Sequence, residues 1–382
     1  MPRFEAVVLA AGLSSRMQGF KPLLPMGSGT TLEIVVSMLL DAAVDRVVVV
    51  AGHRAPEVAA AALKAGAGPV ENAEYASGMY SSVATGVRAL SPDVDGFFLL
   101  PVDIPLVRAA TVRRLAREFL PEKDLILHPC FQGERGHPPL LAGVLVRDIF
   151  DHDGEGGLRG LLERIESETR EKVREIAVPD EGILADMDTD ADYTDLCGRF
   201  ENLALPTLRE CEALMDIVGT PAQTRAHGRA VAKAALALAD ALEKGGIRTT
   251  VLDRDVIERA SLVHDLAKGN NHHEAVGGKI LLEAGFTAIA QPVALHRELE
   301  LPAGEPVSES VLVFLADKLV KGTTAMPLER RYGEVLERHG DDPEARAAIE
   351  GRLAGARLVA ERVGREAGRS PEEIVRAALE ES

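Results

Sequence analysis

The spacing of apolar residues changes near residue 200, and this change constrains the possible folds more than any other feature of the chain. Before that point short apolar runs alternate with helical stretches, and the strand-like runs are Glu5–Ala10, Arg46–Ala51, Gly96–Leu100 and Leu125–His128. This alternation predicts an α/β domain with a Rossmann-like, mostly parallel sheet covered on both faces. Beyond residue 200 no strand pattern remains, so the second half is predicted to be all-α. The 382 residues suffice for two domains, which we expect at residues 1–200 and 201–382.

Several helix starts carry recognisable signals. Thr30 and Glu33 have the spacing of a capping box at the start of a helix expected over Leu32–Ala43. In the second half Thr220 precedes Pro221, a pair that suits a cap and a first helical position. Further helices are expected over Pro56–Ala65 and after Ser370.

The composition excludes several functions. A net charge of −17 argues against binding to nucleic acid or to an anionic membrane surface, and the absence of Trp disfavours base stacking. No run of 18 apolar residues is present, so we expect neither a membrane span nor a signal peptide. The three cysteines, Cys130, Cys197 and Cys211, form no disulfide framework and match no zinc-site spacing, which favours a reducing, cytoplasmic location.

The segment from Leu9 to Pro25 directly follows the first predicted strand and reads LAAGLSSRMQGFKPLLP. Small residues in such a loop allow backbone N–H groups to approach phosphate oxygens closely. Arg16 and Lys21 add fixed positive charge for a triphosphate. The spacing is not that of a Walker phosphate loop, so the segment predicts a different class of nucleotide-binding loop.

This loop resembles the signature of nucleotidyltransferases that attach a nucleotide to the molybdenum cofactor, and of the wider sugar-phosphate nucleotidyltransferase group. Four more motifs follow in family order over about residues 3–200: Asn72–Ser82, Pro101–Val107, Gly133–Pro138 and Asp186–Asp190. The resemblance implies a set of nucleotide-binding residues, namely Leu9, Ala10, Ala11, Gly12, Ser14, Ser15, Arg16, Lys21, Asn72, Gly78, Ser81, Ser82 and Asp103. Ser81 and Ser82 have helix capping as an alternative role.

Carboxylates in these motifs predict a Mg²⁺ site. Asp103 follows a strand at the carboxyl edge of the sheet, where ligands bind in open α/β folds, and Asp188 would complete an oxygen cage. Asp186 and Asp190 remain alternatives to Asp188. The resemblance further implies that the acceptor contacts three residues of one loop, Arg135, Gly136 and His137, although turn-forming Gly and Pro explain part of that motif.

The Leu-Ala-Ala-Gly form of the loop is similar to the cytidylyl branch, which implies CTP as the nucleotide. The implied reaction is in-line attack by a phosphate oxygen of molybdenum-loaded molybdopterin on the α-phosphorus of CTP, with loss of pyrophosphate. Lys21, Arg16 and Asp103 are the expected catalytic residues, acting by positioning and charge. A sugar or polyol phosphate is the alternative acceptor. A molybdenum hydroxylase apoprotein and a second copy of the chain are possible partners.

Five of the ten histidines lie within residues 227–296. His264-Asp265 lies in an apolar helical stretch, where a charged pair is costly unless ligated, whereas His152-Asp153 lies in a polar loop and is expected at the surface. The order His227, His264-Asp265, Asp317 resembles the HD superfamily of metal-dependent phosphohydrolases.

That resemblance implies one or two divalent ions (Mn, Fe, Zn or Mg), with His273 and His296 as additional ligands and Asp265 between the ions. His272 is the alternative to His273. Lys268 lies one helical turn after His264 and is expected to bind phosphate. The implied activity is hydrolysis of a phosphate ester or nucleotide, with a nucleotide-sensing regulatory module as the alternative. The mixed-charge helices from Pro327 onward are expected to serve packing or dimerisation rather than chemistry.

Overall fold

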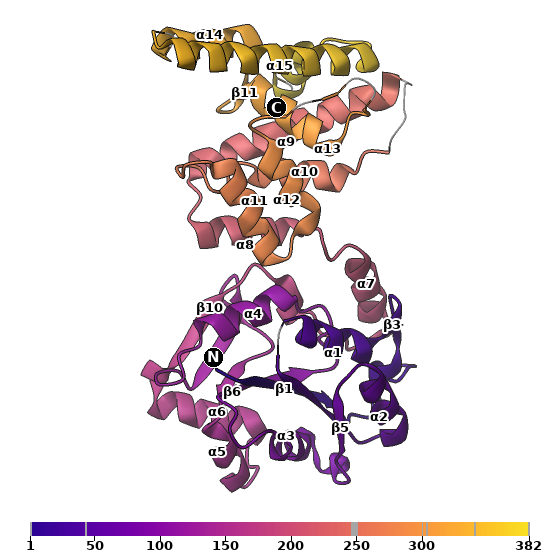
Figure 1. The fold of residues 1–382 in the computed structure, drawn as a ribbon. Helices are drawn as coiled ribbons and strands as arrows, with labels where there is room; N and C mark the ends of the chain where they lie inside the picture. The colour runs from indigo at the N-terminus through magenta and orange to yellow at the C-terminus, as the bar shows by residue number, and fades with distance from the viewer. Residues whose placement is uncertain are drawn as a thin grey trace. The chain divides into compact units, whose positions relative to one another are not determined.

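A computed structural model describes residues 2–42, 44–245, 251–299, 301–302, 305–339 and 341–380. The chain divides into two compact units, Met1–Leu203 and Ala204–Ser382, each of which has its own core (Figure 1). The predicted helix end at Ala43 lies outside the described residues.

The first unit is built on one sheet with the strand order β10-β7-β9-β6-β1-β4-β5, to which β8 adds by pairing with β7. The strands are β1 (Phe4–Ala10), β4 (Arg46–Ala51), β5 (Gly68–Glu71), β6 (Gly96–Pro101), β7 (Ile126–Phe131), β8 (Glu134–Arg135), β9 (Leu140–Ala142) and β10 (Val173–Ala177). The central strand β1 is buried throughout and pairs in parallel with β4 and β6. Only β8 and β9 run antiparallel to their described neighbours in this sheet, so the predicted mostly parallel α/β sheet is confirmed.

Helices cover both faces of this sheet. The helices of this unit are α1 (Thr31–Asp41), α2 (Ala55–Lys64), α3 (Met79–Arg88), α4 (Ala109–Glu118), α5 (Leu145–Asp151), α6 (Gly157–Glu168) and α7 (Asp190–Glu201), of which α7 lies beside the β2–β3 hairpin rather than on the sheet. Figure 1 shows α1 and α4 on one face and α3, α5 and α6 on the other. A small hairpin of β2 (Pro25–Met26) and β3 (Gly29–Thr30) leads into α1, whose start has the predicted capping box between Thr30 and Glu33.

The second unit is helical, as predicted, apart from a hairpin of β11 (Val320–Lys321) and β12 (Thr324–Ala325). Its helices are α8 (Leu208–Val218), α9 (Ala222–Gly245), α10 (Arg254–Val263), α11 (His273–Ala284), α12 (Thr287–Leu295), α13 (Glu309–Leu319), α14 (Leu328–His339), α15 (Pro343–Ala367) and α16 (Pro371–Glu380). α9 begins one residue later than expected, so Pro221 precedes its first helical residue, and its carbonyl accepts a hydrogen bond from the Arg225 N–H.

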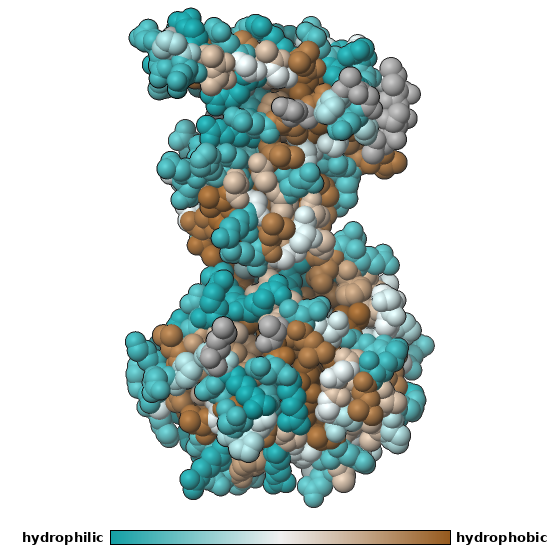
Figure 2. Space-filling view, in the orientation of Figure 1, coloured by the Kyte–Doolittle hydropathy of each residue, from teal (hydrophilic) through white to brown (hydrophobic). Residues whose placement is uncertain are grey.

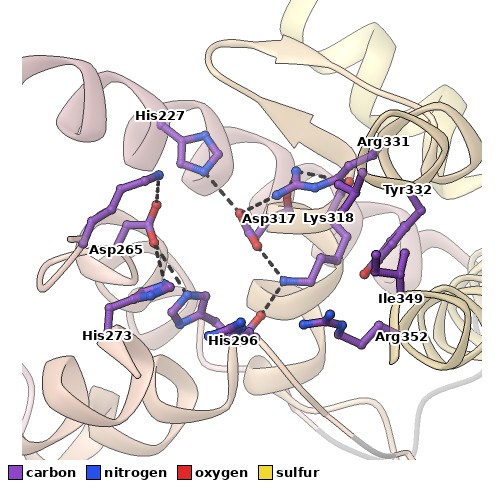
Figure 3. A pocket seen from close by; sticks show the side chains of 13 residues that line it. His227, Asp265, His273, His296, Asp317, Lys318, Arg331, Tyr332, Ile349 and Arg352 are labelled. Atoms are coloured by element: carbon purple, nitrogen blue, oxygen red, sulfur yellow. Dashed lines mark hydrogen bonds and ion pairs between the residues drawn. The ribbon is translucent and has the colours of Figure 1, made fainter. Parts of the chain in front are cut away.

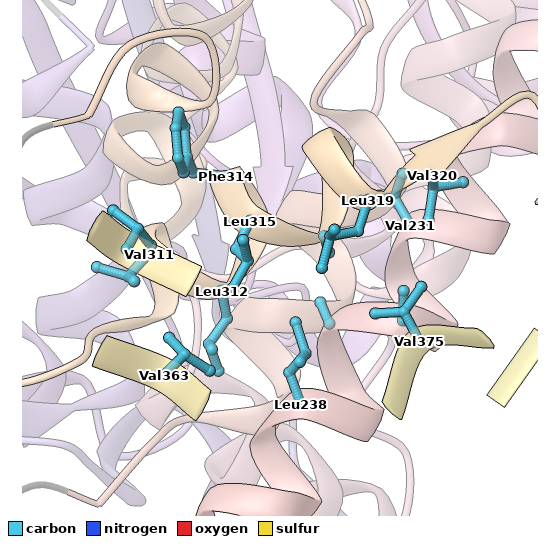
Figure 4. Close-up of a cluster of buried hydrophobic side chains, with 14 of the residues drawn as sticks. Val231, Leu238, Val311, Leu312, Phe314, Leu315, Leu319, Val320, Val363 and Val375 are labelled. Atoms are coloured by element: carbon cyan, nitrogen blue, oxygen red, sulfur yellow. The ribbon is translucent and has the colours of Figure 1, made fainter. Parts of the chain in front are cut away.

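Helices α9 and α13 lie at the centre of the core of the second unit. Residues 311–319 of α13 are all buried, and Leu312 and Leu315 pack with Leu238 of α9 (Figure 4). Val363 of α15 and Val375 of α16 complete this cluster. Because α13 is enclosed by other helices, polar groups that it carries must be paired or ligated.

Figure 2 shows hydrophilic and hydrophobic residues intermixed over the visible face. Within the described ranges, no helix combines the length and hydropathy that crossing a lipid bilayer requires.

Candidate active sites

The loop after β1 folds back so that Lys21 returns to the end of the strand. Ser14 adopts a left-handed backbone conformation with φ of 53°, which few residues other than glycine tolerate. The Ser14 hydroxyl oxygen accepts a hydrogen bond from the Lys21 N–H at 3.0 Å, and the Ser14 carbonyl accepts one from the Met17 N–H at 3.2 Å. These bonds close the turn from Ser14 to Lys21, and just before this turn a Cβ added at Gly12 would meet no other atom within 4 Å.

Lys21 lies between two carboxylates that come from distant parts of the chain. Its Nζ is 2.9 Å from Asp103 Oδ2 and 3.0 Å from Asp188 Oδ1. Asp103 follows β6, the parallel neighbour of β1, so both loops emerge at the same edge of the sheet. The Met187 N–H donates to the Asp103 carbonyl at 2.9 Å and holds Asp188 alongside. Arg16 adds an ion pair with Asp188 at 3.1 Å.

Three carboxylates converge beside this lysine. Oxygens of Asp103, Asp186 and Asp188 all lie within 4.8 Å of one another. Burial raises the pKa of Asp186, and the charges of Asp103 and Asp188 raise it further. Burial alone would lower the pKa of Lys21, but its bonds and ion pairs with Asp103 and Asp188 outweigh this and raise it. Such a cluster of like charges fits an oxygen-liganded divalent cation.

The predicted alternatives to Asp188 behave differently. Asp186 joins the cluster, whereas Asp190 is the first residue of α7 and accepts a hydrogen bond from the Gln18 N–H at 3.4 Å.

A pocket of about 710 Å³ opens beside these carboxylates. Ten of the thirteen predicted nucleotide-binding residues line it: Leu9, Ala11, Gly12, Ser14, Ser15, Arg16, Lys21, Gly78, Ser82 and Asp103. The sequence analysis did not single out other lining residues, among them Leu13, Pro22, Tyr75, Ala76, Met79, Pro101 and Val102.

The other three predicted residues do not line the pocket. Ala10 is buried in β1. The amide nitrogen of buried Asn72 donates to the hydroxyls of Ser81 and Ser82 at 2.8 and 3.0 Å, so Asn72 positions the start of α3. Gly78, not either serine, is at the N-cap of that helix.

The predicted acceptor loop forms the β7–β8 hairpin and the turn after it. Arg135 is held by Glu166 at 2.9 Å and Glu175 at 2.7 Å, so its charge is already paired. Gly136 lies so close to Ile183 that an added Cβ would be 2.5 Å from its carbonyl oxygen. Burial lowers the pKa of His137, whose buried Nδ1 has no hydrogen-bond partner. His137 therefore carries unused binding capacity.

The second candidate site gathers imidazoles and carboxylates from five helical segments (Figure 3). His227 comes from α9, and Asp317 comes from α13. The other four side chains lie at or beside helix ends: His264 and Asp265 just after α10, His273 at the start of α11 and His296 just after α12. Each interruption of a helix thus places a polar side chain in an otherwise apolar bundle.

Asp265 and Asp317 are the two centres of this cluster. Asp317 Oδ1 is 3.2 Å from His227 Nε2 and 3.6 Å from His264 Nε2. Asp265 Oδ1 is 3.3 Å from His273 Nε2 and 3.7 Å from His296 Nε2. Asp265 belongs to two groups of potential ligands, His227–His264–Asp265 and Asp265–His273–His296, and the ligand atoms within each lie within 4.8 Å of one another.

Backbone carbonyls orient three of the four imidazoles. The Nδ1 atoms of His227, His264 and His296 lie 2.9, 2.8 and 2.6 Å from the carbonyl oxygens of Gly322, Ser261 and Val293. Donation from Nδ1 leaves the Nε2 lone pair directed at the carboxylates, an arrangement typical of metal-ligating histidines. His264 is fully buried and its Nε2 has no hydrogen-bond partner. An unpaired buried nitrogen of this kind fits a divalent metal ligand.

Both carboxylates are held in the charged form. Burial alone would raise the pKa of Asp265, but His296, His264 and Lys268 outweigh it and hold the pKa far below its ordinary value. Lys318, His227 and His264 likewise outweigh burial and hold the pKa of Asp317 well below its usual range. The cluster therefore offers anionic oxygen ligands at neutral pH.

Several expectations around this site need correction or refinement. His273, not His272, reaches Asp265, while His272 is exposed and faces Glu274. The side chain of His152 is covered by Tyr80 rather than exposed, although its neighbour Asp153 is exposed.

The helices from Pro327 onward were expected to serve packing or dimerisation only, but some of their side chains line the pocket of the second site. Arg331, Tyr332 and Arg352 line the pocket of about 390 Å³ beside the two aspartates, together with Lys268 and Lys318. Of these pocket residues other than Lys268, which was predicted, only Lys318 could have been suspected from the sequence, because it directly follows Asp317. Arg331 and Arg352 lie on helices whose mixed charge resembles an ordinary solvated face.

Fold and geometry together define an α/β nucleotidyltransferase-type domain and a helical domain with a buried His-Asp cluster in one chain. The family model of the MobA-like NTP transferase domain matches residues 6–171, and that of the HD domain matches residues 224–322. The chain thus combines a cytidylyltransferase-like nucleotidyltransferase domain with an HD domain, and the predictions of both families and of an enzyme are confirmed.

Among proteins similar to this chain is the molybdenum cofactor cytidylyltransferase of Escherichia coli (strain K12), which is 28% identical over 191 residues, covering 48% of this chain and 96% of that protein. The bifunctional protein GlmU of Solibacter usitatus is 38% identical over 152 residues, covering 38% of this chain and 31% of that protein. A solved nucleotidyl transferase from Methanothermobacter is 27% identical, with a TM-score of 0.46, covering 52% of this chain and 98% of that one.

Proposed function

We propose that the first domain transfers CMP from CTP to the phosphate of molybdenum-loaded molybdopterin and releases pyrophosphate. The observation that carries this proposal is the placement of Lys21 between Asp103 and Asp188 at the mouth of the pocket formed by the glycine and serine loop. The similarity to the E. coli cytidylyltransferase, over nearly the whole of that protein, supports the choice of nucleotide and acceptor.

The chain's own groups account for binding and charge compensation. Gly12, Ser14 and Ser15 line the pocket, and there is open space where a Cβ of Gly12 would lie, so we expect backbone N–H groups of this loop to bind phosphates. Arg16 is mostly exposed, so it is free to follow the leaving pyrophosphate. Asp103, Asp186 and Asp188 would hold Mg²⁺, which when bound supplies positive charge between carboxylates and phosphates. Lys21 then turns from the carboxylates toward the phosphates.

The test is pyrophosphate release from each nucleoside triphosphate in the presence of molybdenum-loaded molybdopterin or of sugar and polyol phosphates. We expect turnover with CTP and the pterin alone. Turnover with a sugar or polyol phosphate, and none with the pterin, would refute molybdopterin as the acceptor but would still support nucleotidyltransferase activity. Turnover with GTP in preference to CTP would refute the assignment of the nucleotide.

For the second domain we propose metal-dependent hydrolysis of a phosphate ester or nucleotide. His227, His264, Asp265 and Asp317 would hold one divalent ion, and His273 and His296 with Asp265 a second. When bound, such ions supply Lewis acidity toward phosphate oxygens. Lys268 Nζ is 2.5 Å from Asp265 Oδ2, and its side chain is half exposed, so it is placed to bind an incoming phosphate.

The substitution Asp265→Ala separates hydrolysis from regulation. A hydrolase loses phosphate release while CMP transfer keeps its rate. A sensing module instead shows altered transfer kinetics when a nucleotide is added, and this result would favour the regulatory alternative. The surface substitution Asp153→Ala, in the other His-Asp pair, is the matched control.

A further inference from the structure

The pocket beside the HD cluster carries more positive charge than one phosphate group needs. Among the described residues that line it, five are cationic: Lys268, Arg297, Lys318, Arg331 and Arg352. Only two lining residues, Asp265 and Asp317, are carboxylates. This excess occurs in a chain with a net charge of −17, so it is a local property of the pocket.

Two of these cations are only loosely paired. Arg352 donates its Nε–H to the Ala348 carbonyl at 3.2 Å, which leaves its terminal N–H groups for other partners. Among the described residues, the ion pair of Arg297 is with Glu274 at 3.7 Å, and that of Arg352 is with Glu298 at 3.9 Å. Both distances exceed those of hydrogen bonds. In contrast, Arg331 donates to the carbonyls of Asp317 and Val320 at 2.5 and 2.6 Å, so its role is to hold the end of α13. Arg297 and Arg352 therefore keep donors for a ligand.

The same two arginines also line a second space. A hollow of about 770 Å³ shares part of its lining with the pocket. Its lining includes Arg297 and Arg352, two carboxylates, Glu298 and Glu305, and a mainly apolar wall of Leu295, Leu299, Val311, Phe314 and Ala356. We call this space the apolar hollow. Its volume is in the range of pockets that hold small organic ligands. Figure 3 shows the guanidinium of Arg352 directed into the pocket beside the two aspartates, toward Lys318.

We propose that this domain binds an organic substrate with two separated phosphate-type groups, one at the His-Asp cluster and one between Arg297 and Arg352. The organic part lies in the apolar hollow. A planar guanidinium pair suits a phosphate because each presents two parallel N–H donors. This inference rests on the proposed hydrolase function of the same pocket and assigns the class of its substrate.

The test compares two probes of equal organic structure, adenosine 3′,5′-bisphosphate and adenosine 5′-monophosphate. Their affinities for the full-length protein with Mn²⁺ are measured by calorimetric titration. We expect the bisphosphate to bind at least about 10-fold more tightly, equivalent to about 1.4 kcal/mol. In the double variant Arg297→Gln, Arg352→Gln this ratio should fall to near one, while the monophosphate affinity changes little.

Arg365→Gln, an exposed arginine on the same helix as Arg352, is the matched control and should keep the full ratio. The variant Arg297→Lys, Arg352→Lys keeps the positive charges but loses the paired N–H donors of the guanidinium groups. We expect its ratio of bisphosphate to monophosphate affinity to lie between those of the wild type and the Gln variant, and this variant serves as the test if the Gln variant folds poorly. Equal affinity of the two probes for the wild type, or a preference that survives the double substitution, would overturn the inference. If neither probe releases phosphate while the preference is present and arginine-dependent, the hydrolase function alone fails.

Discussion

The ammonium group of Lys21 lies between Asp103 and Asp188 and balances their negative charge. Replacement of Lys21 by alanine removes a cation from beside three clustered carboxylates. It also removes a positive charge that we expect to bind the triphosphate. We therefore expect Lys21→Ala to lower kcat/KM for CMP transfer by about 100-fold or more. Lys64→Ala, at an exposed lysine paired with Glu33, is the control and should leave the rate unchanged. A Lys21→Ala enzyme of near wild-type rate would remove the lysine from the site.

The fully buried His264 should decide whether the helical domain retains metal. Among the described residues its Nε2 has no hydrogen-bond partner, and the nearby carboxylates of Asp317 and Asp265 lie 3.6 and 3.7 Å away, so alanine at this position removes a ligand atom without breaking a hydrogen bond there. We expect His264→Ala to lose at least half of the divalent metal that the wild type keeps after dialysis, measured by mass spectrometry. His152→Ala, which alters the other His-Asp pair, should retain wild-type metal content. Equal retention by both variants would contradict the ligand assignment.

The three thiols should differ sharply in reactivity. Burial raises the pKa of Cys130 to about 11 and that of Cys211 to about 12. At pH 8 roughly one in a thousand Cys130 side chains, and fewer for Cys211, is the reactive thiolate. We expect iodoacetamide to modify only the partly exposed Cys197 in the native protein, as read by peptide mass spectrometry. Complete modification of all three after unfolding is the control, and native labelling of Cys130 would contradict the burial of β7.

At the scale of elements, close packing of α3 on the sheet depends on a glycine. A Cβ at Gly86 would lie 2.3 Å from Val7 Cγ1 and 2.8 Å from Val50 Cγ2, in the middle of β1 and β4. Gly86→Ala should therefore lower the free energy of unfolding of the first unit by about 1–3 kcal/mol. Gly198 in α7 has open space around it, so Gly198→Ala should be neutral or stabilise by up to about 1 kcal/mol. Chemical denaturation distinguishes these outcomes, and equal effects of the two substitutions would contradict the packing.

The elements also show where sequence periodicity succeeds and fails. The runs of β1 and β4 are long, apolar and central, so their pattern alone predicted parallel strands. Strand β9 has only three residues, Leu140–Ala142, which is too short for any period to appear, and its antiparallel direction depends on contacts with β6 and β7. Strand β5 contains Pro69, and proline in such a short run is more typical of a turn than of a strand. It is tolerated here because β5 forms the edge of the sheet.

At the scale of the whole molecule, the chemical clusters could be predicted from motifs, but the pockets around them could not. Asp103 and Lys21, or His227 and Asp317, were found because each belongs to a short pattern of reactive residue types. Arg297 and Arg352 belong to no such pattern, and they line the same pocket only because the residues after α12 and those of α15 are both folded beside it. Substrate selection is therefore the part of this site that depends most on tertiary structure.

Two units with separate cores should respond separately to metal. In the second unit the proposed ligands His227, His264 and Asp317 are gathered and buried only in the folded state, so a bound ion stabilises that state over the unfolded chain. A free ion at about 100 times its Kd adds about 2.7 kcal/mol. We expect removal of metal by a chelator to lower the Tm of one unfolding transition in calorimetry, and Mn²⁺ to restore it. The same transition should lose its metal response in His264→Ala, which assigns it to residues 204–382. A response that persists in that variant would place the stabilising ion elsewhere, because removing a buried ligand must weaken the site whose occupancy the shift measures.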